Sequence, residues 1–313
     1  MNQPLVSIAL CTYNGSEYLK EQLDTLDGQT YKNLELVIVD DGSSDGTIEL
    51  LRQFAQNSSL NIKIYINDEN LGYIKNFEKA ISLCNGDYIA LCDQDDVWDE
   101  RKIETLVKHI GDNLLIYHDS ALINETGDPL GQKISNLRNC YSGTDSRVFL
   151  FENCVSGHAI LFKKELLTFI DGFNKTIIHD WWLAYAAANN GSIFFLDQEL
   201  VQYRQHSNAN TNILRQKRDQ NIKPDSLEKI ERQLNIVKLF AEYPFNTDKA
   251  FKNKLAQLME RRIHSYVCVS LPWFMFRHRK LLLYIQKKSA LSKLNFILKF
   301  TFGYKLKRLL KAQ

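Results

Sequence analysis

The stretch YIALCDQDDVW at residues 88–98 joins an apolar run directly to a cluster of acids. Tyr88–Cys92 has the length and composition of a buried β-strand, and Asp93–Asp96 follows without a break. Ligands of α/β sheets bind beyond the carboxyl ends of the strands. This junction therefore predicts a ligand site at a strand end.

The alternation of strand and helix extends upstream of this stretch. Apolar runs of strand length occupy residues 5–11, 34–39 and 62–66, and helical spacing appears between them at 16–26 and 47–54. A further helix through Phe77 and Ala80 precedes residue 88. Strands that alternate with helices predict an α/β fold with a mostly parallel sheet. Polar residues end three of these strands, and we expect them to meet at one edge of the sheet: Thr12, Tyr13, Asn14, Asp40, Asp41 and Asp93–Asp96.

The rest of the chain predicts two further regions. Residues 111–215 hold strand-like runs at 114–117, 159–162 and 193–196, which would complete the sheet. After about residue 212, Leu, Ile and Lys recur at helical spacing, which predicts a separate helical region. The expected boundaries are residues 1–110, 111–215 and 216–313.

Charge is distributed unevenly along the 313 residues. The net charge is +2, but residues 261–313 carry thirteen Lys or Arg and no acid, whereas residues 1–260 carry a net charge of −11. This asymmetry argues against a uniformly basic nucleic-acid-binding protein. It favours a local basic patch that meets an anionic surface, such as a membrane.

Cysteine usage and the N-terminus indicate a compartment. The six Cys residues form no CxxC pair, which is typical of reduced thiols in a cytosolic protein. Met1–Pro4 begins no signal peptide, and no later run reaches the ~18–20 apolar residues that a spanning helix needs. We therefore expect a cytoplasmic protein.

The acidic clusters at the strand ends have two interpretations each. Carboxylate oxygens of Asp93–Asp96 suit Mg²⁺ or Mn²⁺, and the alternative is a solvated turn that caps the helix starting near Asp99. Asp40 and Asp41 can accept hydrogen bonds from a base or a ribose. Their alternative is an N-capped turn before Thr47.

Two later segments carry further polar candidates. Asp180 stands beside Trp181 and Trp182 at the predicted start of a helix, where it can act as a general base. The alternative is that Asp180 caps this helix while both Trp side chains pack in the core. Arg204 and His206, on a predicted loop, offer a guanidinium for phosphate and an imidazole for metal or phosphate. As isolated residues, they would usually be solvated or structural.

These segments, in this order, resemble family 2 glycosyltransferases of the GT-A fold, and among them bacterial rhamnosyltransferases and polysaccharide-building enzymes. The resemblance covers roughly residues 5–215 and rests on VSIALCTYNG (6–15), VIVDDGSSDGT (37–47) and DQDDVW (93–98). It implies a Rossmann-like mixed sheet flanked by helices, with a C-terminal helical extension. Residues 1–110 would bind the donor nucleotide sugar and residues 111–215 the acceptor.

The resemblance also implies a role for each candidate. Asp180 would be the catalytic base that deprotonates the acceptor hydroxyl. Nucleotide contacts would come from Thr12, Tyr13, Asn14, Asp40, Asp41, Asp93, Gln94 and Arg204. The metal ligands would be Asp95, as first choice, with Asp96 and His206. Acceptor contacts would come from Gly157, His158, Trp181 and Trp182.

The implied reaction is an inverting single displacement supported by Mn²⁺ or Mg²⁺. One sugar, with rhamnose suggested by resemblance, would pass from a dTDP- or UDP-linked donor to a lipid-linked glycan. His179 stands where the family has Glu before the catalytic Asp, and Gln202–His206 lacks the Trp of processive synthases. Two alternatives follow: a nucleotide-sugar-binding scaffold without turnover, and a nucleotidyltransferase, although the Gly-rich phosphate loop of the latter is missing.

The basic tail has its own interpretation. Residues 271–310 interleave aromatic and aliphatic groups with Lys and Arg, the composition of an interfacial amphipathic helix. We expect peripheral binding at the inner face of the plasma membrane, where a lipid-linked acceptor would lie. The alternatives are packing of the tail on the acidic body and assembly of a homo-oligomer. The acidic body disfavours nucleic acid as a partner.

Overall fold

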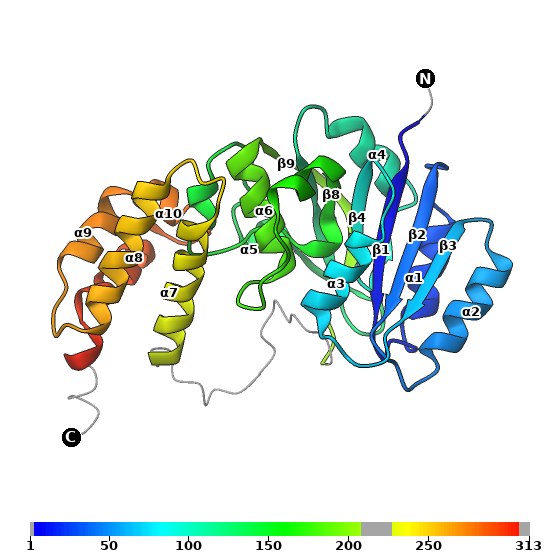
Figure 1. Ribbon diagram of the computed structural model, residues 1–313, viewed down its shortest axis with the longest axis horizontal. Helices are drawn as coiled ribbons and strands as arrows, with labels where there is room; N and C mark the ends of the chain where they lie inside the picture. The colour runs from blue at the N-terminus through cyan, green and yellow to red at the C-terminus, as the bar shows by residue number, and fades with distance from the viewer. Residues whose placement is uncertain (1–2, 208–226, 307–313) are drawn as a thin grey trace. The chain divides into compact units, whose positions relative to one another are not determined.

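The computed structural model describes residues 3–207 and 227–306 (Figure 1). Contacts divide the chain into two compact units. The first comprises Met1–Thr144 and Val155–Leu214, and the second comprises Asp145–Cys154 and Arg215–Gln313. Each unit has its own secondary structure and is described separately.

The first unit is built on a nine-stranded sheet with the order β3-β2-β1-β4-β8-β6-β9-β5, and β7 pairs with β6. The strands are β1 (Val6–Thr12), β2 (Leu34–Asp40), β3 (Asn61–Ile66), β4 (Tyr88–Cys92), β5 (Val97–Trp98), β6 (Leu115–Ile123), β7 (Pro129–Lys133), β8 (Ile160–Lys163) and β9 (Ile193–Arg204).

The pairing of strands changes from parallel to antiparallel at β4. Strands β1, β2, β3 and β4 are parallel, as predicted, whereas β8 is antiparallel to both β4 and β6. The register sets Thr12 beside Asp40, and Leu10 beside Cys92. The polar residues that follow these strands therefore leave the sheet at one edge. The sheet runs through both of the halves expected from the sequence, so residue 110 marks no break in it.

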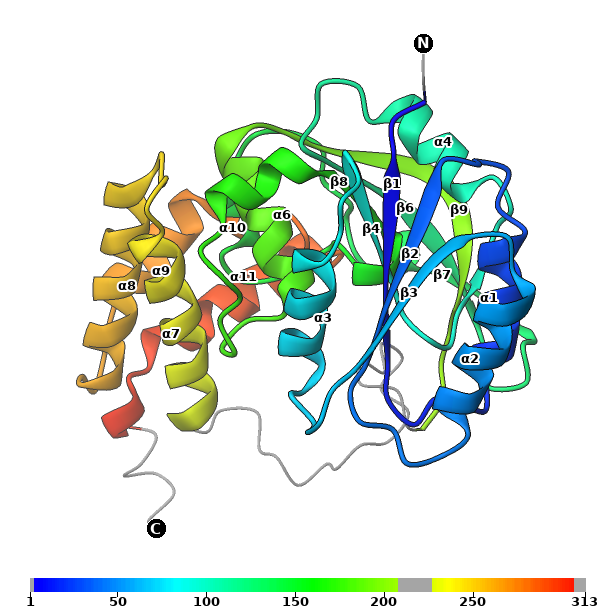
Figure 2. The ribbon, with the colours of Figure 1, turned by 45° about the vertical axis from the view of Figure 1, so that its right-hand side comes forward.

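Helices cover both faces of the sheet. They are α1 (Leu19–Asp27), α2 (Thr47–Asn57), α3 (Tyr73–Ser82), α4 (Lys102–His109), α5 (Ile134–Leu137) and α6 (His179–Asn190). Figure 2 shows α3 on one side of β1–β3, and α1 and α2 on the other. Alternate residues of β1 and β2, such as Ile8 and Leu36, share a buried cluster with Leu23 of α1 and Leu51 of α2. Burial of each such side chain contributes about 1.5–3 kcal/mol and fixes the strand register.

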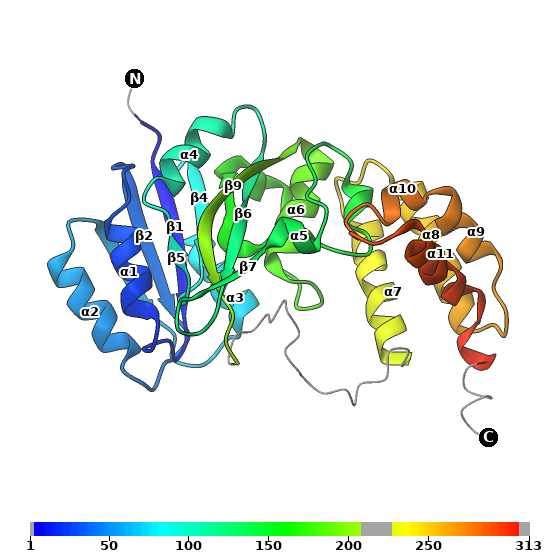
Figure 3. The same cartoon turned by 180° about the vertical axis from the view of Figure 1, so that it is seen from behind.

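The second unit is helical in its described part (Figure 3). Its helices are α7 (Leu227–Glu242), α8 (Lys249–Ile263), α9 (Ser270–Arg277), α10 (Arg279–Leu282) and α11 (Ala290–Leu298). No helix among the described residues is both long enough and apolar enough to cross a bilayer.

The residues and helices of the second unit differ from two expectations based on the sequence. Residues 145–154, placed by sequence in the acceptor half, belong to this unit because Lys252 Nζ donates to Ser146 Oγ at 2.9 Å and Gln286 Nε2 to Glu152 Oε1 at 2.7 Å. The tail is also not one amphipathic helix. It breaks after α9, and α11 starts anew where the Ser289 hydroxyl accepts a hydrogen bond from Ser292 N. Residues 307–310 lie outside the described residues.

Candidate active site

Asp40, at the end of β2, organises the loop that follows it. Its carboxylate is fully buried and accepts hydrogen bonds from Thr12 Oγ1 at 2.7 Å and from Ser43 N at 2.8 Å. Thr12 is its register partner on β1, so the bond ties two neighbouring strand ends together. In this structure, Asp40 shapes the turn before α2.

Asp41 lies one residue further on and holds the loop that leads to α3. Its carboxylate accepts hydrogen bonds from Asn67 Nδ2 at 2.7 Å, Leu71 N at 2.8 Å and Gly72 N at 2.9 Å. Gly72 has a φ of +81°, a left-handed conformation that favours glycine. An ionised carboxylate offers about four acceptor positions, so an additional hydrogen bond to Asp41 is chemically feasible. The predicted base contact stays a prediction.

The loop after β1 is held by Gln94. The side chain of Gln94 accepts from Tyr13 N at 2.8 Å and donates to Tyr13 O at 3.1 Å. Asn14, with a φ of +44°, accepts from Ser44 N at 2.9 Å. A Cβ at Gly15 would lie 2.2 Å from Gln94 Oε1, so a side chain there would displace the Gln94 amide from these contacts. These contacts fix the backbone and leave the Tyr13 side chain 48% exposed.

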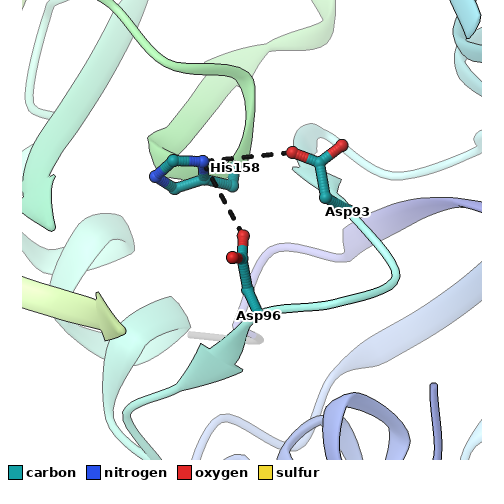
Figure 4. Close-up of side chains that lie close together, drawn as sticks. All are labelled: Asp93, Asp96 and His158. Carbon is teal, nitrogen blue, oxygen red and sulfur yellow. Dashed lines mark ion pairs between the residues drawn. The ribbon is translucent and has the colours of Figure 1, made fainter. Parts of the chain in front are cut away.

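Asp93 and Asp96 face one histidine (Figure 4). His158 Nδ1 lies 3.7 Å from Asp96 Oδ2 and 3.9 Å from Asp93 Oδ2, both longer than a hydrogen bond. Asp96 is fully buried, and its Oδ2 has no hydrogen-bond partner among residues 3–207 and 227–306. The three side chains can each offer a ligand atom within 4.8 Å of the others, so they form a candidate cation site.

Burial controls protonation in this cluster. Loss of hydration raises the pKa of Asp96 well above its usual value and that of Asp93 to about 7, and the nearby charge of Asp95 raises both further. Asp180 also raises the pKa of Asp93, which places it close to this carboxylate. Burial lowers the pKa of His158 to about 3, so its imidazole is neutral, the form that binds metals.

Asp95 and His206 form a second pair at the same strand ends. Their Oδ2 and Nε2 atoms are 2.8 Å apart, and their side chains remain 17% and 9% exposed. The sequence predicted both as metal ligands, and the structure brings them together. Asp96, the third predicted ligand, points instead toward His158, while its Oδ1 accepts from Arg204 N at 3.1 Å.

The sequence suggested a loop at Arg204, but Arg204 is the last residue of β9. Its buried guanidinium donates to Asp95 O at 2.9 Å, Glu125 O at 3.0 Å and Glu21 Oε2 at 2.6 Å. These contacts link three segments and neutralise the buried charge. A contact with a diphosphate, which would compete with Glu21, stays a prediction.

Gly157 lies against the start of α6, which carries Asp180. A Cβ at Gly157 would lie 3.2 Å from His179 Nε2 and 4.0 Å from Asp180 Oδ2. The first distance is tighter than most real Cβ contacts, so with a side chain at residue 157 the His179 ring would have to give by a few tenths of an ångström. Gly157, Asp180 and Asp93 thus share one region of the first unit.

Comparison with known proteins now decides the family. Residues 7–169, more than half of the chain, match the family described as glycosyl transferase family 2. The chain belongs to glycosyltransferase family 2. An uncharacterized glycosyltransferase of Haemophilus influenzae is 25% identical over 75% of this chain and 76% of its own length. An uncharacterized Mycobacterium tuberculosis protein, Rv1520, is 27% identical over 65% of this chain but 60% of its own length.

Solved structures show the fold of this family 2 glycosyltransferase. S. aureus TarS 1–349 in complex with UDP-GlcNAc superposes with a TM-score of 0.60 at 18% identity, covering 90% of this chain and 74% of TarS 1–349. The mannosyltransferase PcManGT from Pyrobaculum calidifontis, in complex with GDP-Man and Mn²⁺, gives a TM-score of 0.55 at 19% identity, with 90% and 74% coverage. The first unit has the predicted GT-A fold, and the C-terminal helical extension is present.

The two tryptophans of this glycosyltransferase differ in exposure. Trp182 is 7% exposed and stacks on Tyr185, with ring centroids 5.8 Å apart. Its burial argues against the acceptor contact predicted for it and favours the packing alternative. Trp181 is half-buried and retains surface that an acceptor can touch. His158, a further predicted acceptor contact, is 2% exposed and faces the acids instead.

Sequence reasoning missed Lys102 and His118. Lys102 is fully buried, its Nζ donates to His158 O at 2.6 Å, and burial lowers its pKa to about 7. His118 Nδ1 lies 2.6 Å from Asp119 O, and burial lowers the pKa of His118 well below its usual value. The polar run His118–Ser120 directly follows the apolar run at residues 114–117, and this is the signal that marked the other clusters, although β6 continues through it. Lys102 carries no comparable signal.

Proposed function

We propose that this family 2 glycosyltransferase moves a single sugar from a dTDP- or UDP-linked donor to a hydroxyl group of a lipid-linked saccharide, with inversion, in bacterial cell-surface polysaccharide synthesis. The observation that carries the proposal is the proximity of Asp180 to Asp93: burial raises the pKa of Asp93 to about 7, and the charges of Asp95 and Asp180 contribute to the rise. A transferase needs a base beside the groups that hold the diphosphate. Rhamnose is the first donor sugar to test.

The donor would lie over the ends of β1, β2 and β4. Tyr13 offers an exposed ring for the base, and Asp41 retains capacity to accept a hydrogen bond from it. TarS is described with UDP-GlcNAc and PcManGT with GDP-Man, so proteins of this fold hold different nucleotides. A panel of nucleotide-sugar donors therefore has to identify the nucleotide and the sugar.

A divalent ion, Mn²⁺ or Mg²⁺, would be held by Asp95 and His206. These ions commonly use few protein ligands and complete their coordination with substrate phosphates, so their site must be accessible. Asp95 and His206 are both partly exposed, whereas in the other candidate set only Asp93 is, and Asp96 and His158 are almost completely buried. The bound ion would offset the charge that develops on the departing diphosphate. Asp93, Asp96 and His158 are the second candidate set, favoured by the unpartnered Asp96 Oδ2.

Asp180 would perform the proton transfer. Its carboxylate takes the proton from the acceptor hydroxyl as that oxygen bonds to the anomeric carbon. The bond from the anomeric carbon to the diphosphate breaks, and its electron pair leaves with the nucleoside diphosphate. Gly157 lies against the start of α6, which carries Asp180, and positioning of such a base can supply several kcal/mol of rate enhancement.

We assign the remaining partners on the same basis. Residues 1–110 would bind the donor, residues 111–215 the acceptor, and the basic region within 216–313 the inner face of the plasma membrane, where a lipid-linked acceptor resides. Thirteen basic side chains and no acid in residues 261–313 support the membrane assignment. The alternative is that this region mediates assembly of a homo-oligomer.

A scaffold without turnover is the second candidate, and His179 favours it. This residue replaces the Glu expected before Asp180, and its buried Nδ1 has no hydrogen-bond partner in the described part of the chain. Its ring packs 4.3 Å from that of Phe77, and burial lowers its pKa to about 3, so it supplies no charge.

Donor turnover tests the proposal. The protein, with Mn²⁺ or Mg²⁺ and membrane extract, is incubated with UDP-, dTDP- and GDP-sugars, and released nucleoside diphosphate is measured. Release that is lost in Asp180→Asn but kept in Asp112→Asn, an exposed acid elsewhere, supports the transferase. Donor binding without release supports the scaffold, and release of pyrophosphate a nucleotidyltransferase.

A further inference from the structure

The second unit exposes an unusual number of large apolar side chains. Val269, Trp273 and Leu291 are 65–67% exposed, and Leu298 and Phe302 are each 51% exposed. We call the following set the apolar face: Val267, Val269, Trp273, Phe276, Leu291, Leu294, Leu298 and Phe302. Contiguous exposed apolar side chains mark an interaction site more often than scattered ones do.

The segments that carry the apolar face are neighbours. Val267 forms a β-bridge with Phe302, supported by the hydrogen bond from Cys268 N to Thr301 O at 2.8 Å. Helix α9 packs against α11 and against the short 3₁₀ helix at Lys299–Thr301 (Figure 3). Leu291, Leu294 and Leu298 are spaced three and four residues apart and therefore lie along one side of α11.

The apolar face is not needed to hold the unit together. Other side chains of α9 and α11 are buried, among them Leu271, Met275 and Ile297. Arg262, on α8, donates to Phe302 O at 3.3 Å and to Lys299 O at 3.4 Å, which anchors the end of the tail. The exposed side chains therefore sit on a scaffold that is already packed.

The charge around the apolar face has one sign. Residues 261–306 contain ten Lys or Arg and no Asp or Glu. Lys280, Lys288 and Lys299 are exposed and lie along the chain between residues of the apolar face. A second copy of this chain would bring two basic surfaces together, whereas an anionic lipid leaflet would match both the apolar side chains and their basic surroundings.

We propose that the apolar face inserts into the headgroup region of an anionic membrane leaflet, with the exposed Lys residues binding lipid phosphates. The inference rests on the proposed membrane location and assigns it to named side chains. The membrane would then be contacted by two short helices and a bridged loop, and not by the single amphipathic helix expected from the sequence. Trp273 would enter the interface, the depth that tryptophan prefers.

Vesicle sedimentation of the full chain tests this inference. Vesicles of phosphatidylcholine with and without phosphatidylglycerol are compared, without donor or acceptor. The variant Val269→Ser/Trp273→Ser/Leu291→Ser/Leu298→Ser should weaken binding to anionic vesicles by at least about tenfold. Lys280→Gln, Lys288→Gln and Lys299→Gln should each weaken it by about fivefold. The matched control is Phe245→Ser, which changes a 47% exposed aromatic between Glu242 and Asp248 and should leave binding unchanged.

A second measurement reports the insertion directly. The fluorescence of Trp273 should shift to the blue on anionic vesicles, and the shift should vanish in Trp273→Phe. Circular dichroism confirms that each variant is folded. Equal binding to neutral vesicles, full binding by the quadruple variant, or a vesicle-free dimer that the quadruple variant dissociates would overturn the inference. Vesicle binding without sugar transfer refutes the proposed transferase alone, and transfer to a soluble acceptor without vesicle binding refutes this inference alone.

Discussion

His206 Nε2 lies 2.8 Å from Asp95 Oδ2, across 111 residues of chain. Strand β9 carries His206 to the edge of the sheet where the acidic stretch after β4 ends. The pair is partly exposed and adjoins the trio Asp93, Asp96 and His158, of which Asp96 and His158 are buried. The first prediction separates these two candidate metal sites.

Asp95→Asn and His206→Gln should each weaken Mn²⁺ binding by at least about tenfold, because each removes a ligand from an accessible site. Titration of Mn²⁺ by electron paramagnetic resonance, without substrate, measures the affinity. Asp96→Asn and His158→Gln are the matched variants and should retain most of it. The opposite pattern would assign the metal to Asp93, Asp96 and His158.

Asp180→Asn should lower kcat by about 10²–10⁴-fold while the KM for the donor changes little, since the amide keeps the shape but cannot accept the proton. Initial rates of nucleoside diphosphate release provide the test. A proportional loss in Asp112→Asn would show that the effect is not specific to this carboxylate.

Gly157→Ala should slow transfer by about tenfold to 10²-fold without unfolding the protein. The new Cβ would meet His179 Nε2 at 3.2 Å, so the start of α6 that carries Asp180 must shift by a few tenths of an ångström, and catalysis is sensitive to small misplacements. Rates and thermal unfolding are measured together. The control is Gly28→Ala, because Gly28 has a φ of −74° and accepts Ala without strain. Gly127→Ala is unsuitable, because Gly127 has a φ of +90°. An unchanged rate in Gly157→Ala would mean that Asp180 needs no close approach to this loop.

Glu35 should make stability depend on pH in the acid range. Burial alone would raise its pKa, but hydrogen bonds from Ser7, Asn85 and Lys63 outweigh burial and lower the pKa to about 2. A carboxyl with a lowered folded-state pKa stabilises the fold above its unfolded value of about 4.5, and that contribution is lost as the pH falls toward 2.

The contribution of Glu35 is on the order of 2–3 kcal/mol at neutral pH. Urea unfolding at pH 7, 5, 4 and 3 should show a fall in the free energy of unfolding that is smaller in Glu35→Gln. Glu49→Gln, on the exposed side of α2, is the control and should follow the parent protein. Identical slopes in Glu35→Gln and the parent would contradict the lowered pKa.

The first half of the sheet could be predicted because its signals are local. Strand β4 has the bounds that the apolar run Tyr88–Cys92 indicates, and β2 extends one residue beyond the run predicted at 34–39. An apolar run of this length is buried wherever the chain folds, and a polar cluster after it marks the strand end. The family resemblance rests on the same stretches, and the match over residues 7–169 confirms it.

The second half could not be predicted as well because polar residues are buried there by distant partners. Strand β6 continues to Ile123 through His118–Ser120, where the sequence suggested an end at Tyr117. Asp119 is buried inside that strand because Lys133 pairs with it at 3.1 Å and Ser135 Oγ donates to it at 2.6 Å. Periodicity does not reveal such compensation.

By itself, the sequence determined the fold class, the family and the residue types gathered at the strand ends, because hydrophobic periodicity and motif spacing are properties of neighbouring residues. The tertiary structure alone decided that Asp95 meets His206 and Asp96 turns toward His158, and that Arg204 is neutralised by Glu21. It also decided which tail side chains remain exposed. Each of these outcomes depends on burial and on partners far away in the chain. A charged side chain is stable in the folded protein only where water or an opposite charge compensates it, and local sequence does not reveal that partner.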